Sequence, residues 1–185
     1  VSMTVVTPAS PINGGPVPTL DPATGLVTVP PMTPSGAYTI TYQICENLNP
    51  TNCDQGVATI GVNSAPIVAV DDNPASVNGG VGEPSVVNAF TNDTLNGVPV
   101  TVSTITATIV TPASNPGVSM DPATGVVSVA PGTPAGSYTI SYEICETLNP
   151  TNCDQADVTV TVGAGVIVAD DDSISGINGL AGAPN

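Results

Sequence analysis

The sequence predicts an all-β protein built from tandem immunoglobulin-like β-sandwich repeats of about 100 residues each. Residues 21–62 recur at 121–162, and 28 of the 42 aligned residues are identical, which is typical of a tandem array. Stretches rich in Thr, Val and Ile alternate with Gly- and Pro-rich turns, as in a sandwich. No window shows the apolar period of an amphipathic helix.

The repeat divides the chain into three parts. Residues 1–64 match the C-terminal part of one Ig-like repeat, residues 65–163 form a complete repeat, and residues 164–185 match the N-terminal part of the next. The first part carries an insertion of about four residues near Pro11–Pro18. A repeat of this size is large enough to bury its own core. We therefore expect the chain to be an internal segment of a longer repetitive protein.

The complete repeat is predicted to contain about seven short strands, at 65–70, 85–90, 98–110, 117–120, 126–129, 138–145 and 157–162. Gly, Asn and Pro predict loops and turns between them, at 73–84, 91–97, 121–125 and 131–136. The turn at 121–125 reads Asp-Pro-Ala-Thr-Gly, in which Pro presets φ and Gly supplies a positive φ. These residue types explain Asp21 and Asp121 as turn residues rather than catalytic acids.

Four tyrosines recur at a spacing of four within one strand of each copy, as Tyr38, Tyr42, Tyr138 and Tyr142. Alternation along a strand places the two members of each pair on the same face. Aromatic residues are otherwise scarce, so the core must consist mainly of Val, Ile and Ala. Packing on a sheet face, with the hydroxyls bonded to backbone groups, is favoured over a surface for stacking ligands.

The chain has no Lys, Arg or His against 15 Asp and Glu, giving a net charge of −15. Nucleic acid is excluded as a partner because phosphate neutralisation needs cations, and binding to an anionic membrane is disfavoured for the same reason. Direct membrane insertion is not expected either, because no apolar run is long enough to cross a bilayer. Each carboxylate must be solvated, bonded to backbone N–H groups or neutralised by a cation from solution.

The cysteines form two copies of one pattern, Cys45/Cys53 and Cys145/Cys153, each flanking seven residues that contain Asn-Pro-Thr-Asn. The repeat favours a disulfide within each copy, near the mouth of a β-hairpin. Closing so short a loop is worth roughly 2.5 kcal/mol in the chain-entropy model. Metal binding by the thiols is the alternative, but no His is present to support it. Disulfides would indicate an oxidising, extracellular location.

Several motifs resemble known extracellular modules. The residues at 117–146 resemble the second half of bacterial immunoglobulin-like modules, with strand, DPATG turn, strand and GSYTISYE. Residues 65–94 resemble the opening of cadherin-like tandem modules, with AVDD followed by a later Asn-Asp. Combined with YEICETLNPTNCDQ, the order is similar to repeats in giant cell-surface adhesins of gliding Bacteroidota. The chain is identified on these motifs as a repeat of that family.

This resemblance implies a structural role in an extended adhesin filament at the cell surface, serving attachment and gliding motility. The partners it implies are neighbouring repeats, surface polysaccharide or a motility apparatus. Two alternatives stay open: an array of glycan- or protein-binding modules, and a pilus-like polymer assembled by strand donation. No pocket, nucleophile or base supports an enzyme.

Two sets of candidate site residues follow. Calcium prefers carboxylate and carbonyl oxygens, and the residues proposed to hold it near the module junctions are Asp71, Asp72, Asn92, Asp93, Asp154, Asp170, Asp171 and Asp172. The alternative is that these residues are solvated turn and cap residues. Thr94 and Ser173 follow Asp and precede an apolar residue, a pattern that Bacteroidota use for O-linked glycosylation.

Overall fold

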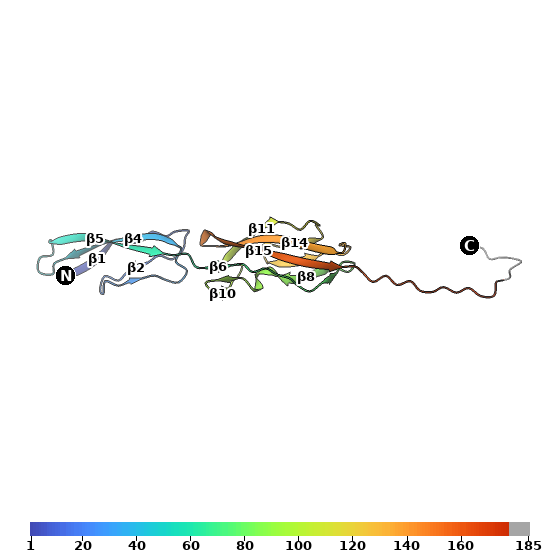
Figure 1. Cartoon of the computed structure of the whole chain (residues 1–185). Coiled ribbons are helices and arrows are strands. Elements are labelled where there is room, and N and C mark those ends of the chain that lie inside the picture. The colour runs from blue at the N-terminus through green and yellow to red at the C-terminus, as the bar shows by residue number, and fades with distance from the viewer. Residues whose placement is uncertain (178–185) are drawn as a thin grey trace.

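The structure is a computed structural model that describes residues 1–177. Two β-sheet modules lie end to end along one axis, and residues 164–177 leave the second module as an extended segment (Figure 1). The name first module is used for residues 1–64 and the name second module for residues 65–163, which are the boundaries that the repeat predicts. Within residues 1–177, no helix has the length and apolar character needed to span a membrane.

The second module is a sandwich whose largest sheet has the order β11-β14-β15-β7, and smaller sheets have the orders β12-β13-β8 and β10-β9-β6. Its strands are β6 (Ile67–Val68), β7 (Val77–Asn78), β8 (Glu83–Asn88), β9 (Thr94–Leu95), β10 (Val98–Pro99), β11 (Ile105–Thr111), β12 (Val118–Met120), β13 (Val126–Val129), β14 (Gly136–Glu146) and β15 (Asn149–Gly163). A short 3-10 helix, η1 (Ala89–Thr91), follows β8. The strand pairs are antiparallel except β15 with β7, which run parallel, and Asp72 forms an isolated parallel bridge with Val158.

The core of the second module lies between these sheets and consists mainly of Val, Ile and Ala, as predicted. Alternate residues of each strand point inward, because a strand has a side-chain period of two. The buried members are Ala89, Phe90, Val100, Ile105, Val118, Met120, Val127, Val129, Ile140, Tyr142, Ile144, Ala156, Val158, Val160 and Val162. Tyr142 and Phe90 pack with ring centroids 6.2 Å apart. Both tyrosines of this module follow the prediction, since Tyr142 is buried in the core and Tyr138 packs against it.

The strand predicted over 98–110 is divided in the structure, which corrects the prediction. Residues 98–99 form β10, and β11 begins only at Ile105. Between them the Thr104 N–H donates to the Thr101 carbonyl, and the Thr101 N–H donates to the Thr104 hydroxyl. These local hydrogen bonds compete with a sheet ladder and turn the chain from one sheet to the other.

The first module repeats the later half of this architecture. Its strands are β1 (Ser2–Thr7), β2 (Thr19–Leu20), β3 (Val27–Thr28), β4 (Gly36–Cys45) and β5 (Cys53–Val62). The pairing of β4 with β5 copies that of β14 with β15, and the irregularity at Val5/Thr7 in β1 copies that at Ile109/Thr111 in β11. Residues 1–64 hold no counterparts of β6 to β10. As a result Val27 is 40% exposed and Val127 is fully buried.

The Asp-Pro-Ala-Thr-Gly turns are built alike in both copies. In the second, the Asp121 side chain accepts from the Ala123 N–H and, at 2.7 Å, from the Thr124 hydroxyl. The Thr124 hydroxyl is the main cause that lowers the pKa of Asp121. Gly125 has a φ of 76°, and a Cβ there would lie 2.6 Å from the Phe90 ring. Both acids are therefore turn residues, as predicted.

Candidate functional site

The cysteines are paired as the repeat predicts. Cys45–Cys53 and Cys145–Cys153 each join directly opposite residues of an antiparallel strand pair, with Cα atoms 4.1 Å apart. Each bond closes the hairpin between β4 and β5 or between β14 and β15. This confirms the hairpin disulfides, which suggest an extracellular location because such bonds persist in oxidising surroundings.

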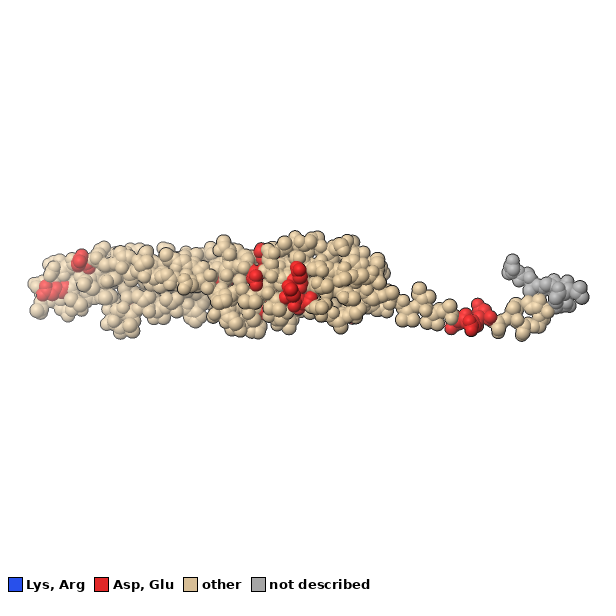
Figure 2. Space-filling view, in the orientation of Figure 1, with Lys and Arg blue, Asp and Glu red and all other residues tan. Residues whose placement is uncertain are grey.

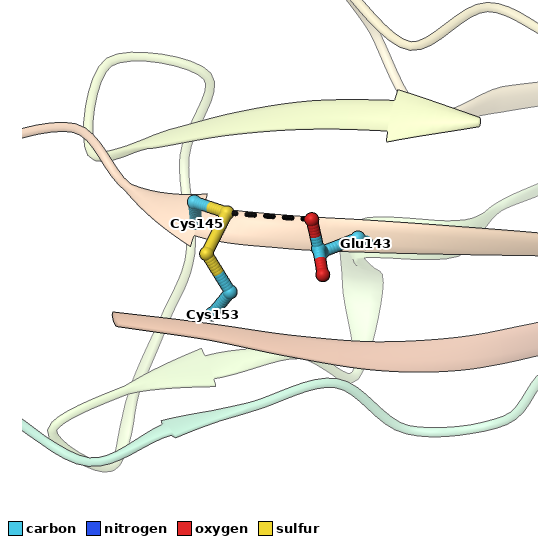
Figure 3. A group of neighbouring side chains, drawn as sticks. All are labelled: Glu143, Cys145 and Cys153. Carbon is cyan, nitrogen blue, oxygen red and sulfur yellow. Dashed lines mark hydrogen bonds between the residues drawn. A yellow bond between two sulfur atoms is a disulfide. The ribbon is translucent and has the colours of Figure 1, made fainter. Parts of the chain in front are cut away.

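The carboxylate of Glu143 lies beside the second disulfide, with Oε1 3.8 Å from the Cys145 sulfur (Figure 3). Among residues 1–177, one group of three Asp, Glu, His or Cys residues has its ligand atoms within 4.8 Å of one another. It consists of Glu143, Cys145 and Cys153. Metal binding by cysteine requires the thiolate. Because both sulfurs are in a disulfide, this group is not a metal site.

Five of the predicted calcium residues gather on one flank of the second module: Asp71, Asp72, Asn92, Asp93 and Asp154. They belong to one module, and no residue of 1–64 joins them among the described hydrogen bonds. Asp170, Asp171 and Asp172 lie apart from them and are exposed in the extended segment. Figure 2 shows the same division, with acidic atoms on the flank and in the extended segment.

Asp93 is the most buried acid of the cluster, with no exposed surface. Its carboxylate accepts from the Val70 N–H at 2.8 Å and from the Tyr142 hydroxyl at 3.0 Å. Burial raises the pKa of Asp93, opposed by these two donors. Asp154 accepts from the Ala69 N–H at 2.9 Å. The two acids therefore fasten the segment after β6 to the large sheet.

The Oδ2 atom of Asp72 is buried and has no hydrogen-bond partner. Among residues 1–177 it is the one buried side-chain oxygen or nitrogen of which this is true. Its backbone is well bonded, since its N–H donates to the Asp157 carbonyl and its carbonyl accepts from the Thr159 N–H. Burial is the main cause that raises the pKa of Asp72 to about 6, and the charge of Asp93 adds to it. An unpartnered carboxylate oxygen in such a place is costly.

This raised pKa predicts a pH-dependent stability. A carboxyl that binds protons more readily in the folded state than in the unfolded state stabilises the fold most at low pH. This stabilising contribution is lost as the pH rises from the ordinary pKa of 3.8 to the raised pKa of about 6. Asp72→Asn should therefore raise the melting temperature at pH 7.5 and have little effect at pH 4. Asp172→Asn, the same change one repeat later in the exposed segment, is the control and should change neither.

The acidic cluster does not form a ready calcium site in this conformation. No three of its carboxylate oxygens lie within 4.8 Å of one another among the described residues, and most accept from backbone N–H groups or Tyr142. The hard oxygen ligands that calcium needs are present, but several side chains would have to turn to share one ion. Calcium binding stays a prediction.

The calcium prediction has a direct thermal test. A ligand that binds only the folded state at 100 times its Kd adds about 2.7 kcal/mol of stability. The melting temperature should therefore be several degrees higher in millimolar calcium than in chelator, and Asp93→Asn should reduce the difference. Magnesium serves as the control ion. A melting temperature that is the same in calcium and in chelator contradicts the prediction.

The two predicted glycosylation residues lie in different settings. Thr94 is half-buried in β9, whose backbone pairs with β6 and β10. Ser173 is exposed in the extended segment. Of the two, Ser173 is the more accessible to a modifying enzyme, and modification of either residue stays a prediction.

The junction between the modules holds polar residues that the sequence prediction did not single out. The Asn149 Oδ1 accepts from the Ser35 N–H at 2.7 Å and from the Ser35 hydroxyl at 2.8 Å. The Asn13 side chain donates to the Leu148 carbonyl at 2.9 Å. A groove of about 510 Å³ lies beside these contacts and is lined by both modules. Asn149 itself is only 4% exposed.

The chain where it enters the second module, at Ala65, is also held by a hydrogen bond from that module. The Asn152 side chain donates to the carbonyl of Ala65 and to Glu146, both at 2.8 Å. Asn149 and Asn152 both come from the loop that the second disulfide closes. The signal in the sequence was the exact recurrence of Leu-Asn-Pro-Thr-Asn between the cysteines, which turn formation alone does not require.

Comparisons with known proteins give only distant structural similarities. No protein-family profile matches the chain, and no curated protein matches its sequence. Among solved structures, it is similar to the human desmocollin-1 ectodomain, at 11% identity and a TM-score of 0.41 over 69% of this chain and 26% of that one. Mouse cadherin-23 EC22–24 gives 12% identity and a TM-score of 0.40, over 89% of this chain and 53% of that one.

A third similar structure is protocadherin gamma B2 extracellular cadherin domains 3–6, at 10% identity and a TM-score of 0.42. The similarity covers 89% of this chain and 43% of that one. The chain thus spans about half or less of the length of these ectodomains. The strands and the buried core of this chain, rather than these distant similarities, define its fold.

Proposed function

We propose that this chain is a structural segment of an extended extracellular adhesion protein. The observation that carries the proposal is the end-to-end arrangement of the two modules (Figure 1). Hydrogen bonds between Asn149 and Ser35 join them. The two disulfides suit an oxidising exterior. A string of such modules gives reach, and many weak contacts along one chain give avidity.

The finer role follows from the sequence motifs. We propose that the parent protein is a surface adhesin of the kind found in gliding Bacteroidota, and that this segment holds adhesive parts away from the cell. Its partners would be neighbouring repeats, with polysaccharide or a motility apparatus bound elsewhere along the parent protein. The net charge of −15 keeps such a filament solvated and limits its self-association.

Small-angle X-ray scattering of residues 1–163, which leaves out the extended segment, tests the proposed shape. β15 alone spans roughly 50 Å at the usual rise per residue, so two modules placed end to end should give a rod with a maximum dimension of about 90 Å or more. Two modules folded side by side would give a much shorter maximum dimension and would contradict a spacer role.

The role in adhesion is tested in the parent protein. Removing one whole repeat of about 100 residues should shorten the reach of the filament and reduce attachment of cells, while the purified protein still binds its target. Loss of target binding in the purified protein would instead favour the alternative, in which each module is itself a binder. A glycan array with residues 65–163 examines that alternative directly.

Strand donation is a second candidate because one observation favours it. Residues 1–64 expose Val27, Val29 and Ile44, whose counterparts Val127, Val129 and Ile144 are buried. Val166 and Ile167 are exposed in the segment that matches the strand β6 and its flanks. Sedimentation of the chain with and without residues 164–185 tests the idea. Association that depends on this segment supports donation, and monomers in both cases exclude it.

A further inference from the structure

We infer that the disulfide-closed loop of each module is a docking site for a turn of the preceding module. The inference rests on the proposed end-to-end function and names the residues that join one module to the next. The docking loop is defined as residues 146–152, with its copy at 46–52. The docked turn is defined as residues 30–36, with its copy at 130–136. The ligand of the loop at 46–52 is then the turn 130–136 of a second copy of this chain.

The occupied loop shows how the site is built. The Asn149 Oδ1 accepts both hydrogen bonds that Ser35 offers, at 2.7 and 2.8 Å. Asn149 is 4% exposed and Glu146 is 8% exposed, although both are polar residues of a loop. Buried polar groups are normally hydrogen-bonded, and the partner of Asn149 comes from the other module. The loop is thus completed by the turn.

The same loop without a docked turn is present in this chain. Residues 46–52 differ from residues 146–152 only at Asn47, where the second copy has Thr147. In the free copy, Leu48 is 88% exposed, Asn49 is exposed, and the flanking strands stop at the cysteines. In the docked copy, the strands continue into the loop, and β15 begins at Asn149 itself.

The docked loop has support from its own module as well. The Thr147 N–H donates to the Thr104 carbonyl, and Asn152 donates to Ala65. The loop would therefore be partly buried by its own module even without the docked turn. The hydrogen bonds from Ser35 are evidence of docking itself, because Ser35 belongs to the first module.

The turn presents its donors through a structure shared by both copies. Thr33 closes the first turn by donating to the Pro30 carbonyl at 2.7 Å, and Thr133 donates to the Ala130 carbonyl at 2.6 Å. The residue after Pro34 is Ser35, whereas the residue after Pro134 is Ala135. Position 135 can therefore offer a backbone N–H to Asn49 but no side-chain hydroxyl, so this contact is weaker.

The chemistry of the site suits a chain without cationic side chains. With no Lys, Arg or His, no side-chain salt bridge can hold two modules together. A neutral amide oxygen accepts hydrogen bonds from a neighbour without bringing another negative charge to the interface. The disulfide fixes the ends of the loop and so positions the Asn side chain for docking.

Amide hydrogen exchange at Ser35 in the 185-residue chain tests the docked site. Asn149→Ala should raise the exchange rate of the Ser35 amide by about tenfold, because one hydrogen bond is lost. Asn49→Ala, the same change in the free loop, is the matched control and should leave that rate unchanged. The Val158 amide, in the core of the second module, should stay protected in both variants. Equal Ser35 rates in all three proteins would overturn the inference.

The free site is tested by adding excess unlabelled chain to isotope-labelled chain and recording the side-chain amide signals of Asn49. Concentration-dependent shifts that disappear when the added chain carries Ala135→Pro, which removes the donating N–H, support docking of the second turn. Absence of any shift up to millimolar concentration overturns this half of the inference.

The outcomes separate this inference from the proposed function. Loss of Ser35 protection in Asn149→Ala, with rod-like scattering kept, shows docking that is not needed for extension. A wild-type chain that is compact in scattering but protected at Ser35 contradicts the spacer role and leaves the docking site standing.

Discussion

Ile144→Ala should destabilise the second module by about 3–4 kcal/mol, the usual cost of truncating a fully buried Ile. Ile144 has no exposed surface and lies on β14 in the centre of the core. Ile44, the same residue one repeat earlier, is 38% exposed. Ile44→Ala should therefore cost about 1 kcal/mol or less.

Chemical denaturation monitored separately in each module measures both changes. The two substitutions are chemically identical, so the difference between their losses of unfolding free energy measures how much stability residues 65–104 add by covering the sheet. Equal losses at Ile44 and Ile144 would contradict the described burial, and would mean that the first module is covered by another part of the protein in solution.

Tyr142→Phe should also be strongly destabilising, by about 2–3 kcal/mol, because it removes a hydrogen bond to a buried carboxylate. The Tyr142 hydroxyl lies 3.1 Å from the Ala89 carbonyl and 3.0 Å from the Asp93 Oδ2. Without it, Asp93 keeps only the Val70 N–H as a donor. A buried acid with too few donors is destabilising at neutral pH.

The matched control is Tyr42→Phe, because Tyr42 occupies the same place in the first module and has no hydrogen-bonded hydroxyl among residues 1–177. It should cost less than about 0.5 kcal/mol. The loss in Tyr142→Phe should also shrink at pH 4, where a protonated Asp93 no longer needs the donor. A pH-independent loss would contradict the role of Asp93.

Much of the fold follows from local sequence. The repeat predicts the modules, the Asp-Pro-Ala-Thr-Gly turns are determined by their residue types, and the cysteine spacing predicts both hairpin disulfides. The division of the run at 98–110 was missed because Thr101 and Thr104 form a turn through their hydroxyls, and β-branched residues favour strands in general.

The candidate sites were predictable to different degrees. The sequence predicts one group of acidic residues, because carboxylates without cationic partners need another explanation. The structure places Asp71, Asp72 and Asp93 together but leaves residues 170–172 apart from them, and calcium binding stays a prediction. The link from Tyr142 to Asp93 was not predictable, because it joins residues 49 positions apart in different layers of the sandwich. The role of Asn149 was missed for a similar reason, since a loop asparagine reveals its acceptor function only when the neighbouring module is in place.

The central claim is that consecutive modules are held in one fixed, end-to-end orientation. Residual dipolar couplings of the 185-residue chain in an aligning medium measure this directly, because two rigidly joined bodies share one alignment tensor. We expect the couplings from residues 1–64 and 65–163 to fit a single tensor, with its long axis along the strands of both modules. Two tensors of different magnitude would mean that the modules reorient freely, and would contradict the account.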